Sequence, residues 1–293
     1  MSKLIRSILS IGLSALVLTV LSCASPSGGG GGGGSKLSAP SSVSFNMLGW
    51  MSSPTFAFLR VGGHSGTLQT INTGGYMTAL VYGSNGTLYG VENQLFTMNT
   101  TTGVATLIGP LNLGSETQIL MCAAAVSPSG TLYVLENGSL KRLFTVNVAT
   151  GALTLVGTVQ AVVRSIAFAS DGTLYAGFSS LYKLNPANGA TVATVGALGS
   201  SGYLNSLFFD TTGTLFGSTP GGAMLWINYE TGASKTMLTM ATTSLSALIP
   251  EKNSPSALFQ LAPVAPAASA AQPSADDVDA ARAVMDAQEA AAH

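Results

Sequence analysis

The chain has 293 residues, of which only 8% are charged, and its formal net charge is −1. Soluble domains typically carry about 25% charged residues, so Ser, Thr, Gly and Asn must supply most of the polar surface here. Nucleic-acid recognition needs a concentrated positive field, and the few Lys and Arg residues are scattered. We therefore exclude nucleic acid as the expected partner.

The first 22 residues are typical of an export signal. Lys3 and Arg6 form a basic start, and an apolar stretch follows over residues 8–21. Ser22 directly before Cys23 resembles a bacterial lipobox, the motif at which signal peptidase II cuts and on whose cysteine lipid is attached. The alternative is an ordinary secretory signal that happens to contain a cysteine. The resemblance implies that Cys23 is the lipid attachment site.

Residues 23–42 are predicted to be a flexible tether, because they include seven consecutive glycines at positions 28–34. Polyglycine has no side chains to pack and the largest backbone freedom of any sequence. Such a segment holds a domain away from a membrane without fixing its orientation. Ala24, rather than Asp, after the cysteine fits sorting to the outer membrane. The expected location is the bacterial cell envelope, on the extracytoplasmic side, with the lipid at Cys23 as membrane partner.

A short motif of a turn followed by a β-rich run returns at intervals of 41 to 44 residues. Its five copies are Gly86-Thr87-Leu88-Tyr89, Gly130-Thr131-Leu132-Tyr133, Gly172-Thr173-Leu174-Tyr175, Gly213-Thr214-Leu215-Phe216 and, more loosely, Ser256-Ala257-Leu258-Phe259. A repeat of this length cannot bury its apolar faces alone and must stack on its neighbours.

Each repeat reads as four short strands joined by tight turns. In residues 78–111, for example, apolar or alternating runs are separated by turns at Asn85-Gly86, at Asn93 and at residues 100–103. Asn-Gly between β-rich runs favours a type I′ hairpin, because both residues tolerate positive φ. No helical periodicity long enough to cover a sheet occurs in this region. The repeat is therefore predicted to be an antiparallel meander.

The first strand of each repeat has a slim face and a bulky face. Seven positions before the turn glycine, the residues are all small: Ala79, Ala123, Ser165 and Ser206. Six and four positions before it they are mostly large: Leu80 and Tyr82, Ala124 and Val126, Ile166 and Phe168, Leu207 and Phe209. Adjacent residues of a strand point to opposite faces. Each sheet is therefore expected to nest its bulky face against the slim face of a neighbour.

The two ends of the repeat region complement each other. Residues 58–61 and 66–71 match the third and fourth strands of a repeat, with Gly66 in the place of Gly189 and Leu59 in that of Tyr182. Residues 245–250 and 256–261 match the first and second strands. Joining the ends closes a ring without a free sheet edge. The prediction is an all-β, five-bladed β-propeller over residues 43–262, and an open β-solenoid is the structural alternative.

The repeats resemble the bacterial propeller repeats related to the NHL and YncE-like families. The residues that carry the resemblance are an apolar run, an Asp171-Gly172-type turn before Thr-Leu-Tyr, a Leu-Tyr strand and a closing Thr-Gly turn. The chain departs from NHL repeats in lacking that family's typical His and acidic positions. The resemblance implies a propeller over about residues 57–262, on which binding modules, scaffolds and some enzymes are built.

No catalytic, cofactor or metal site is predicted. Asp171 occupies a column otherwise filled by turn formers, so we interpret it as a turn residue and not as a calcium ligand. Glu92 and Glu136 occupy equivalent hairpin positions, and surface hairpin residues are a better account than a general acid/base pair. His64 lies in a glycine-rich turn without an evident partner, and Cys122 in an apolar run is expected to be buried and unreactive.

Two segments fall outside the repeat. Residues 43–51 are apolar and are expected to pack across one end of the ring, with a partner-binding surface as the alternative. Residues 263–293 begin as an Ala/Pro linker, and residues 274–292 read as an Ala-rich helix.

The sequence thus predicts a lipid-anchored envelope protein whose propeller is a non-catalytic interaction or scaffold module, with an envelope protein or glycan as partner. Two alternatives stay open. One is a propeller enzyme, either a glycan hydrolase or lyase or a lactonase, and the other is a carbohydrate-binding propeller. Three or more carboxylates that converge at one mouth of the central channel would favour the enzyme.

Overall fold

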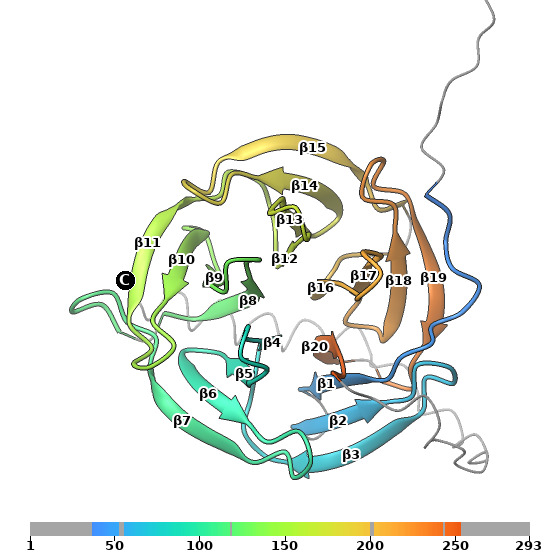
Figure 1. Ribbon diagram of the computed structural model, residues 1–293, viewed down its shortest axis with the longest axis horizontal. Helices are drawn as coiled ribbons and strands as arrows, with labels where there is room; N and C mark the ends of the chain where they lie inside the picture. The colour runs from blue at the N-terminus through green and yellow to red at the C-terminus, as the bar shows by residue number, and fades with distance from the viewer. Residues whose placement is uncertain (1–36, 53–55, 118, 200–201, 243, 253–293) are drawn as a thin grey trace, which may run out of the picture. The chain divides into compact units, whose positions relative to one another are not determined.

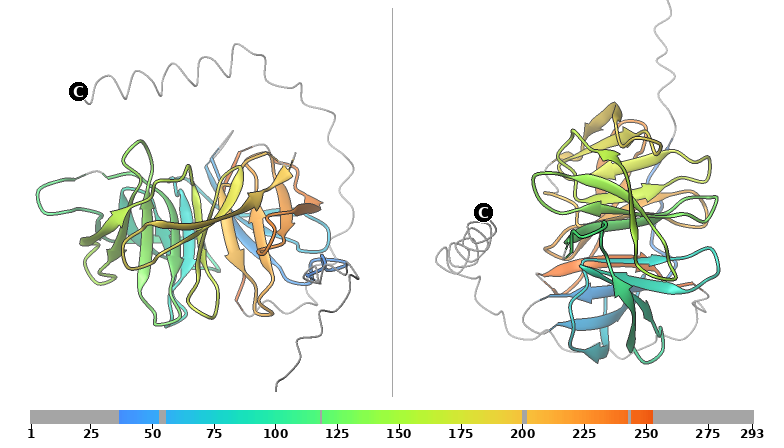
Figure 2. Two further views of the ribbon diagram at one scale, coloured as in Figure 1. Left: turned by 90° about the horizontal axis from the view of Figure 1, so that it is seen from above. Right: turned by 90° about the vertical axis from the view of Figure 1, so that its left-hand side faces the viewer.

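The computed structural model describes residues 37–52, 56–117, 119–199, 202–242 and 244–252. Within these ranges the chain forms 20 strands, arranged as five four-stranded antiparallel sheets around a central axis (Figure 1). The side views in Figure 2 show the sheets standing next to one another as blades. The predicted five-bladed β-propeller is confirmed.

Four blades are continuous in sequence. Blade I contains β4 (Ala79–Tyr82), β5 (Leu88–Val91), β6 (Gln94–Met98) and β7 (Ala105–Pro110). Blade II contains β8 (Met121–Val126), β9 (Leu132–Glu136), β10 (Arg142–Val146) and β11 (Leu153–Thr158). Blade III contains β12 (Ser165–Phe168), β13 (Leu174–Gly177), β14 (Ser180–Leu184) and β15 (Thr191–Ala197). Blade IV contains β16 (Ser206–Phe209), β17 (Leu215–Ser218), β18 (Ala223–Ile227) and β19 (Ser234–Thr239).

Blade V joins the two ends of the propeller. Its strand order is β20 (Leu245–Pro250), β1 (Met47–Met51), β2 (Ala57–Val61) and β3 (Leu68–Thr73). The first, third and fourth strands are those predicted. The prediction for the second strand is wrong, because residues 47–51 form it in place of residues 256–261. Residues 256–261 lie outside the described residues. Residues 47–51 consequently do not cover an end of the ring, because they are part of its wall.

The backbone of blade V explains why β1 belongs there. Gly49 pairs with Leu248 on one side and with Leu59 on the other, as Gly90 pairs with Leu80 and Phe96 in blade I. A bidentate ion pair fixes the end of this junction, because Arg60 Nη2 lies 2.7 Å from Glu251 Oε1 and Arg60 Nε lies 3.0 Å from Oε2. One strand from the C-terminal side therefore closes three from the N-terminal side.

The hydrophobic core consists of five layers, each shared by two neighbouring blades. Between blades II and III, for example, Ala123 and Ala125 of β8 face Ile166 and Phe168 of β12. This is the predicted nesting of a slim face against a bulky one. Because every layer has two blades as its walls, no blade buries its apolar surface alone.

Glycines of the outer strands, at the rim of the propeller, bring neighbouring blades into backbone contact. In blades I to III an outer-strand glycine, Gly109, Gly157 or Gly196, lies against the last turn of the next blade, at Thr150, Asn188 or Thr231. A Cβ at any of the three would fall far inside van der Waals contact with that backbone carbonyl. The turn glycines that follow, Gly151, Gly189 and Gly232, have φ values of 81°, 73° and 79°. The repeated Thr-Gly or Asn-Gly turn is thus a docking point between blades as well as a turn.

Candidate functional site: the two mouths of the central channel

The inner strands β4, β8, β12, β16 and β20 surround the axis, and each contacts the next around the ring (Figure 1). Successive positions along them line three cavities in turn. Neighbouring cavities share lining residues, so we describe the three together as a central channel with two mouths. Among the described residues, no group of three or more His, Cys, Asp or Glu side chains is placed to hold a metal ion.

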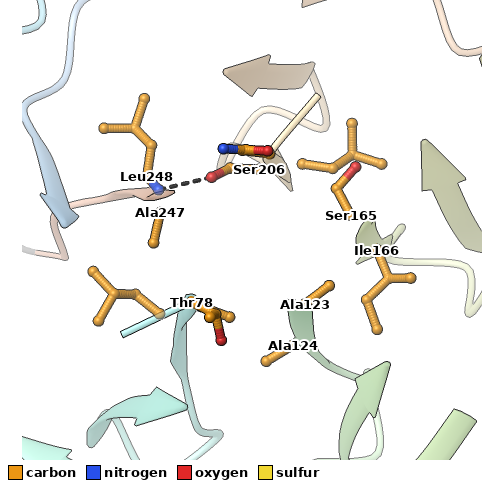
Figure 3. Close-up of a pocket in the computed structure, with 12 residues that line it drawn as sticks. Thr78, Ala123, Ala124, Ser165, Ile166, Ser206, Ala247 and Leu248 are labelled. Carbon is orange, nitrogen blue, oxygen red and sulfur yellow. Dashed lines mark hydrogen bonds between the residues drawn. The ribbon is translucent and has the colours of Figure 1, made fainter. Parts of the chain in front are cut away.

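The waist of the channel is its narrowest part. It has a volume of about 20 Å³ and is lined by small and aliphatic side chains, among them Ala123, Ala124, Ile166 and Ala247 (Figure 3). Ser206 Oγ accepts a hydrogen bond of 2.8 Å from the backbone N–H of Leu248, as the figure shows. A single water needs about 10–15 Å³ in this measure. The waist therefore has room for about one water molecule.

The wide mouth lies at the C-terminal ends of the inner strands and has a volume of about 260 Å³. Its wall is mainly apolar and aromatic, with half-buried Tyr82, Val126, Phe168 and Phe209 from four blades. Burial raises the pKa of the Tyr82 hydroxyl. This mouth suits an apolar group.

Two charged residues line the wide mouth in the described chain. Lys252 places its ammonium 5.0 Å from the centre of the Tyr82 ring, a cation–π contact. Asp210 uses one carboxylate oxygen to accept backbone N–H bonds from Thr212 at 2.9 Å and Thr214 at 2.8 Å. One oxygen of the single carboxylate on this wall is therefore engaged in its own turn.

The polar mouth lies at the N-terminal ends of the inner strands and has a volume of about 60 Å³. Its lining residues are Tyr76, Thr78, Cys122, Asn137, Arg164, Asn205 and Ser246. Arg164 is the one charged side chain among them. Burial, with a smaller contribution from Glu92, raises the pKa of the Tyr76 hydroxyl, and Arg164 opposes this shift.

The structure does not bring Glu92 and Glu136, the two carboxylates at equivalent hairpin positions, together in one site. Glu136 is buried and paired with Arg142, whose Nη2 lies 2.7 Å from Glu136 Oε1 and 2.6 Å from Glu116 Oε1. The hydrogen bond from Arg142 holds the pKa of the Glu116 carboxyl below its usual value. The interpretation of Glu136 as a surface residue is wrong, since it is part of an ion-pair network that ties β9 to β10. It forms no acid/base pair with Glu92.

The other candidates lie where the sequence placed them. Asp171 accepts the backbone N–H of Thr173 at 2.8 Å, as Asn85 accepts that of Thr87 at 3.0 Å, so both are turn residues. His64 is exposed in its turn. Cys23 lies outside the described residues. Sequence reasoning missed Arg164, although it is the one charged residue in its repeat column.

Cys122 is expected to resist thiol reagents in the folded protein. Its thiol is buried, and burial raises its pKa to about 12, so almost no thiolate exists at pH 8. Reaction with a chromogenic disulfide at pH 8 should be complete within minutes in denaturant and at least a hundredfold slower without it. Equal rates in both conditions would contradict the buried position. A Cys23→Ala variant removes the other thiol from this measurement.

Comparison with solved structures finds matches of low sequence identity. The chain is similar to regucalcin, a calcium-binding protein from Agrobacterium tumefaciens, at 19% identity over 65% of this chain and 72% of that one, with a TM-score of 0.43. It is similar to a gluconolactonase from Xanthomonas campestris at 12% identity over 69% and 80%, with a TM-score of 0.48. It is also similar to a chain of the nidogen/laminin complex at 13% identity over 70% and 97%, with a TM-score of 0.45.

No curated protein matches the sequence. A family described as a repeat of unknown function, DUF6923, matches residues 39–254. This range begins just before β1 and ends just after β20, so it spans every blade described above. The chain belongs to the DUF6923 repeat family.

Proposed function

We propose that this protein is a lipid-anchored binding module of the bacterial cell envelope, held by Cys23 and acting through its propeller without catalysis. The lipobox resemblance and the glycine tether support the anchor. The wide mouth is the observation that carries the binding role, because four blades place half-buried apolar or aromatic side chains around one opening of about 260 Å³.

The partner proposed for this mouth is an apolar segment of another envelope protein. Aromatic side chains provide large contact area at a low cost in conformational entropy, as binding surfaces require. Asp210 is the one carboxylate among the described residues of this wall, and one of its oxygens accepts hydrogen bonds from the backbone N–H groups of Thr212 and Thr214. The carboxylate cluster that would favour an enzyme is thus not formed by the described residues of either mouth.

The anchor is tested by the intact mass of the mature protein. The expected N-terminus is Cys23 with a thioether-linked diacylglycerol and an acylated amine. Cys23→Ala should release the protein from the membrane fraction. A mature N-terminus at an unmodified Ser or Ala would refute the anchor.

The binding role is tested by capture from native envelopes with three forms of the full chain. Val126→Glu places a carboxylate in the wide mouth, and Val192→Glu places the same group on the outer strand β15, where Val192 is 65% exposed. A partner retained by the wild type and by V192E but lost by V126E is the expected result. Capture of the same proteins by all three forms would contradict the role of this mouth. Circular dichroism confirms that both variants fold.

A further inference from the structure

Equivalent residues lie at the N-terminal ends of the five inner strands, around the polar mouth, and one of these residues differs in kind. These residues, each eight positions before a turn glycine or at the matching place in β20, are Thr78, Cys122, Arg164, Asn205 and Ser246. Four of these residues have uncharged side chains. The fifth is an arginine on the same ring.

The four neutral residues turn hydrogen-bond donors toward backbone carbonyls. Thr78 Oγ1 donates to Val91 O at 2.9 Å, and Cys122 Sγ lies 3.6 Å from Leu135 O. Asn205 Nδ2 donates to Leu245 O at 2.9 Å, and Ser246 Oγ lies 3.0 Å from Trp50 O. Each of these four side chains therefore has a hydrogen-bonding role within the channel wall.

Arg164 has no such explanation. The described chain contains three arginines, and Arg60 and Arg142 are each clamped by carboxylates at 2.6–2.7 Å. Within the described residues, no acceptor lies in hydrogen-bond or ion-pair contact with the Arg164 guanidinium, which is part of a half-buried residue. A guanidinium has five N–H donors in one plane and stays charged at any physiological pH. Removing it partly from water without an anion costs free energy.

The surroundings of Arg164 indicate which anion fits. A planar carboxylate accepts two parallel hydrogen bonds from a guanidinium, which is the strongest geometry for this group. The rest of the lining is neutral and polar, with the Tyr76 hydroxyl and the Asn137 and Asn205 amides. Arg164 is the one cation of this lining, and the Glu92 charge also acts on its Tyr76 hydroxyl, so the mouth suits one negative charge at most, whereas a phosphate dianion requires more cations. The volume of about 60 Å³ at this mouth suits a group of a few heavy atoms.

We propose that the polar mouth binds the carboxylate of a small organic monoanion, with Arg164 as the anchoring residue. This inference goes beyond the binding role of the wide mouth, because it concerns the opposite mouth and different residues. Either proposal can fail while the other holds.

The test is a titration of the full chain with sodium acetate, followed by the backbone and side-chain amide signals of Asn205 in ¹H–¹⁵N spectra. Sodium chloride and sodium sulfate at equal ionic strength are the reference anions. We expect saturable shifts with acetate, with a dissociation constant in the millimolar range, and at least tenfold weaker binding of chloride and sulfate. Arg164→Gln should abolish saturation, and Arg164→Lys should weaken acetate binding about tenfold.

Lys183→Gln is the matched control, because this lysine contacts the Tyr175 ring of blade III and does not line the polar mouth. It should bind acetate like the wild type. The proposal is overturned if acetate shifts stay linear in the wild type, or if R164Q saturates as the wild type does. Equal binding of sulfate and acetate would also overturn it, since it would indicate a general anion site. The acetate, chloride and sulfate titrations of the wild type test the proposal by themselves. A variant that fails to fold therefore does not decide the outcome.

Discussion

Gly157→Ala is expected to lower the free energy of unfolding by about 2–3 kcal/mol, although alanine adds one methyl group to a strand. The reason is the contact at the rim, where the added Cβ would overlap the backbone carbonyl of Asn188 in the next blade. Backbone cannot rotate away as a side chain can. Blades II and III would have to separate along their whole shared edge, and equilibrium urea unfolding measures the loss.

Gly221→Ala is the matched control for this substitution. Its added Cβ would meet only Thr219 Oγ1, at an ordinary 3.8 Å, and Gly221 does not have a positive φ. Its unfolding free energy should stay within about 0.5 kcal/mol of the wild type. Gly109→Ala and Gly196→Ala should resemble Gly157→Ala, because both glycines make the same rim contact. A Gly157→Ala protein as stable as Gly221→Ala would show that the blades tolerate a looser rim.

Trp50→Ala is expected to cost about 3–5 kcal/mol of stability, the usual range for a fully buried large aromatic side chain. Trp50 is 2% exposed in β1, and its ring lies 5.8 Å from that of Phe58. It fills the core layer between blades V and I, together with Leu48 and Met77. Thermal and urea unfolding followed by circular dichroism measure the change.

Trp226→Ala is the control, because Trp226 is half-buried in the third strand of blade IV, whereas Trp50 is buried in the second strand of blade V. It should cost clearly less than Trp50→Ala. The Trp50 indole N–H has no hydrogen-bond partner among the described residues, so Trp50→Phe should keep most of the stability. A loss below about 1 kcal/mol for Trp50→Ala would mean that residues 47–51 do not form part of the core.

The number and order of the blades could be predicted because they depend on local chemistry repeated in register. Each Gly-Thr-Leu-aromatic motif combines a glycine with positive φ, such as Gly172 at 86°, with a second strand whose leucine is buried. Gly66 is predicted to match Gly189, and the φ angles of the two glycines are similar, 67° for Gly66 and 73° for Gly189. Turn glycines and small-residue columns are visible in one sequence, so the meander and its nesting followed from them.

The strand that completes blade V was misassigned for a specific reason. Residues 256–259 imitate the second-strand motif, whereas β1 has no turn before it, because it is not joined to the first strand of its blade. The sequence feature that identifies β1 as a second strand lies within β1 itself. Leu48-Gly49 matches Tyr89-Gly90 and Phe216-Gly217, where the glycine pairs with a leucine of the inner strand.

The channel mouths were less predictable than the blades, because they depend on which columns of five separate strands converge on the axis. Tyr82, Phe168 and Phe209 were recognised as a repeat column, but the sequence does not show that they surround one opening. The Arg142 network was also hidden. Glu116 comes from a connection between blades, whose path is set by tertiary packing and not by the repeat.

The closure of the ring by β1 and β20 is the central claim, and two truncated chains test it directly. A chain that ends at Asn253 keeps both strands, and it should unfold cooperatively within about 0.5 kcal/mol of the full chain in urea. A chain that begins at Ser52 lacks β1, and it should show no cooperative transition. If the first chain fails to fold while the second folds, residues 256–261 complete blade V and the closure described here is wrong.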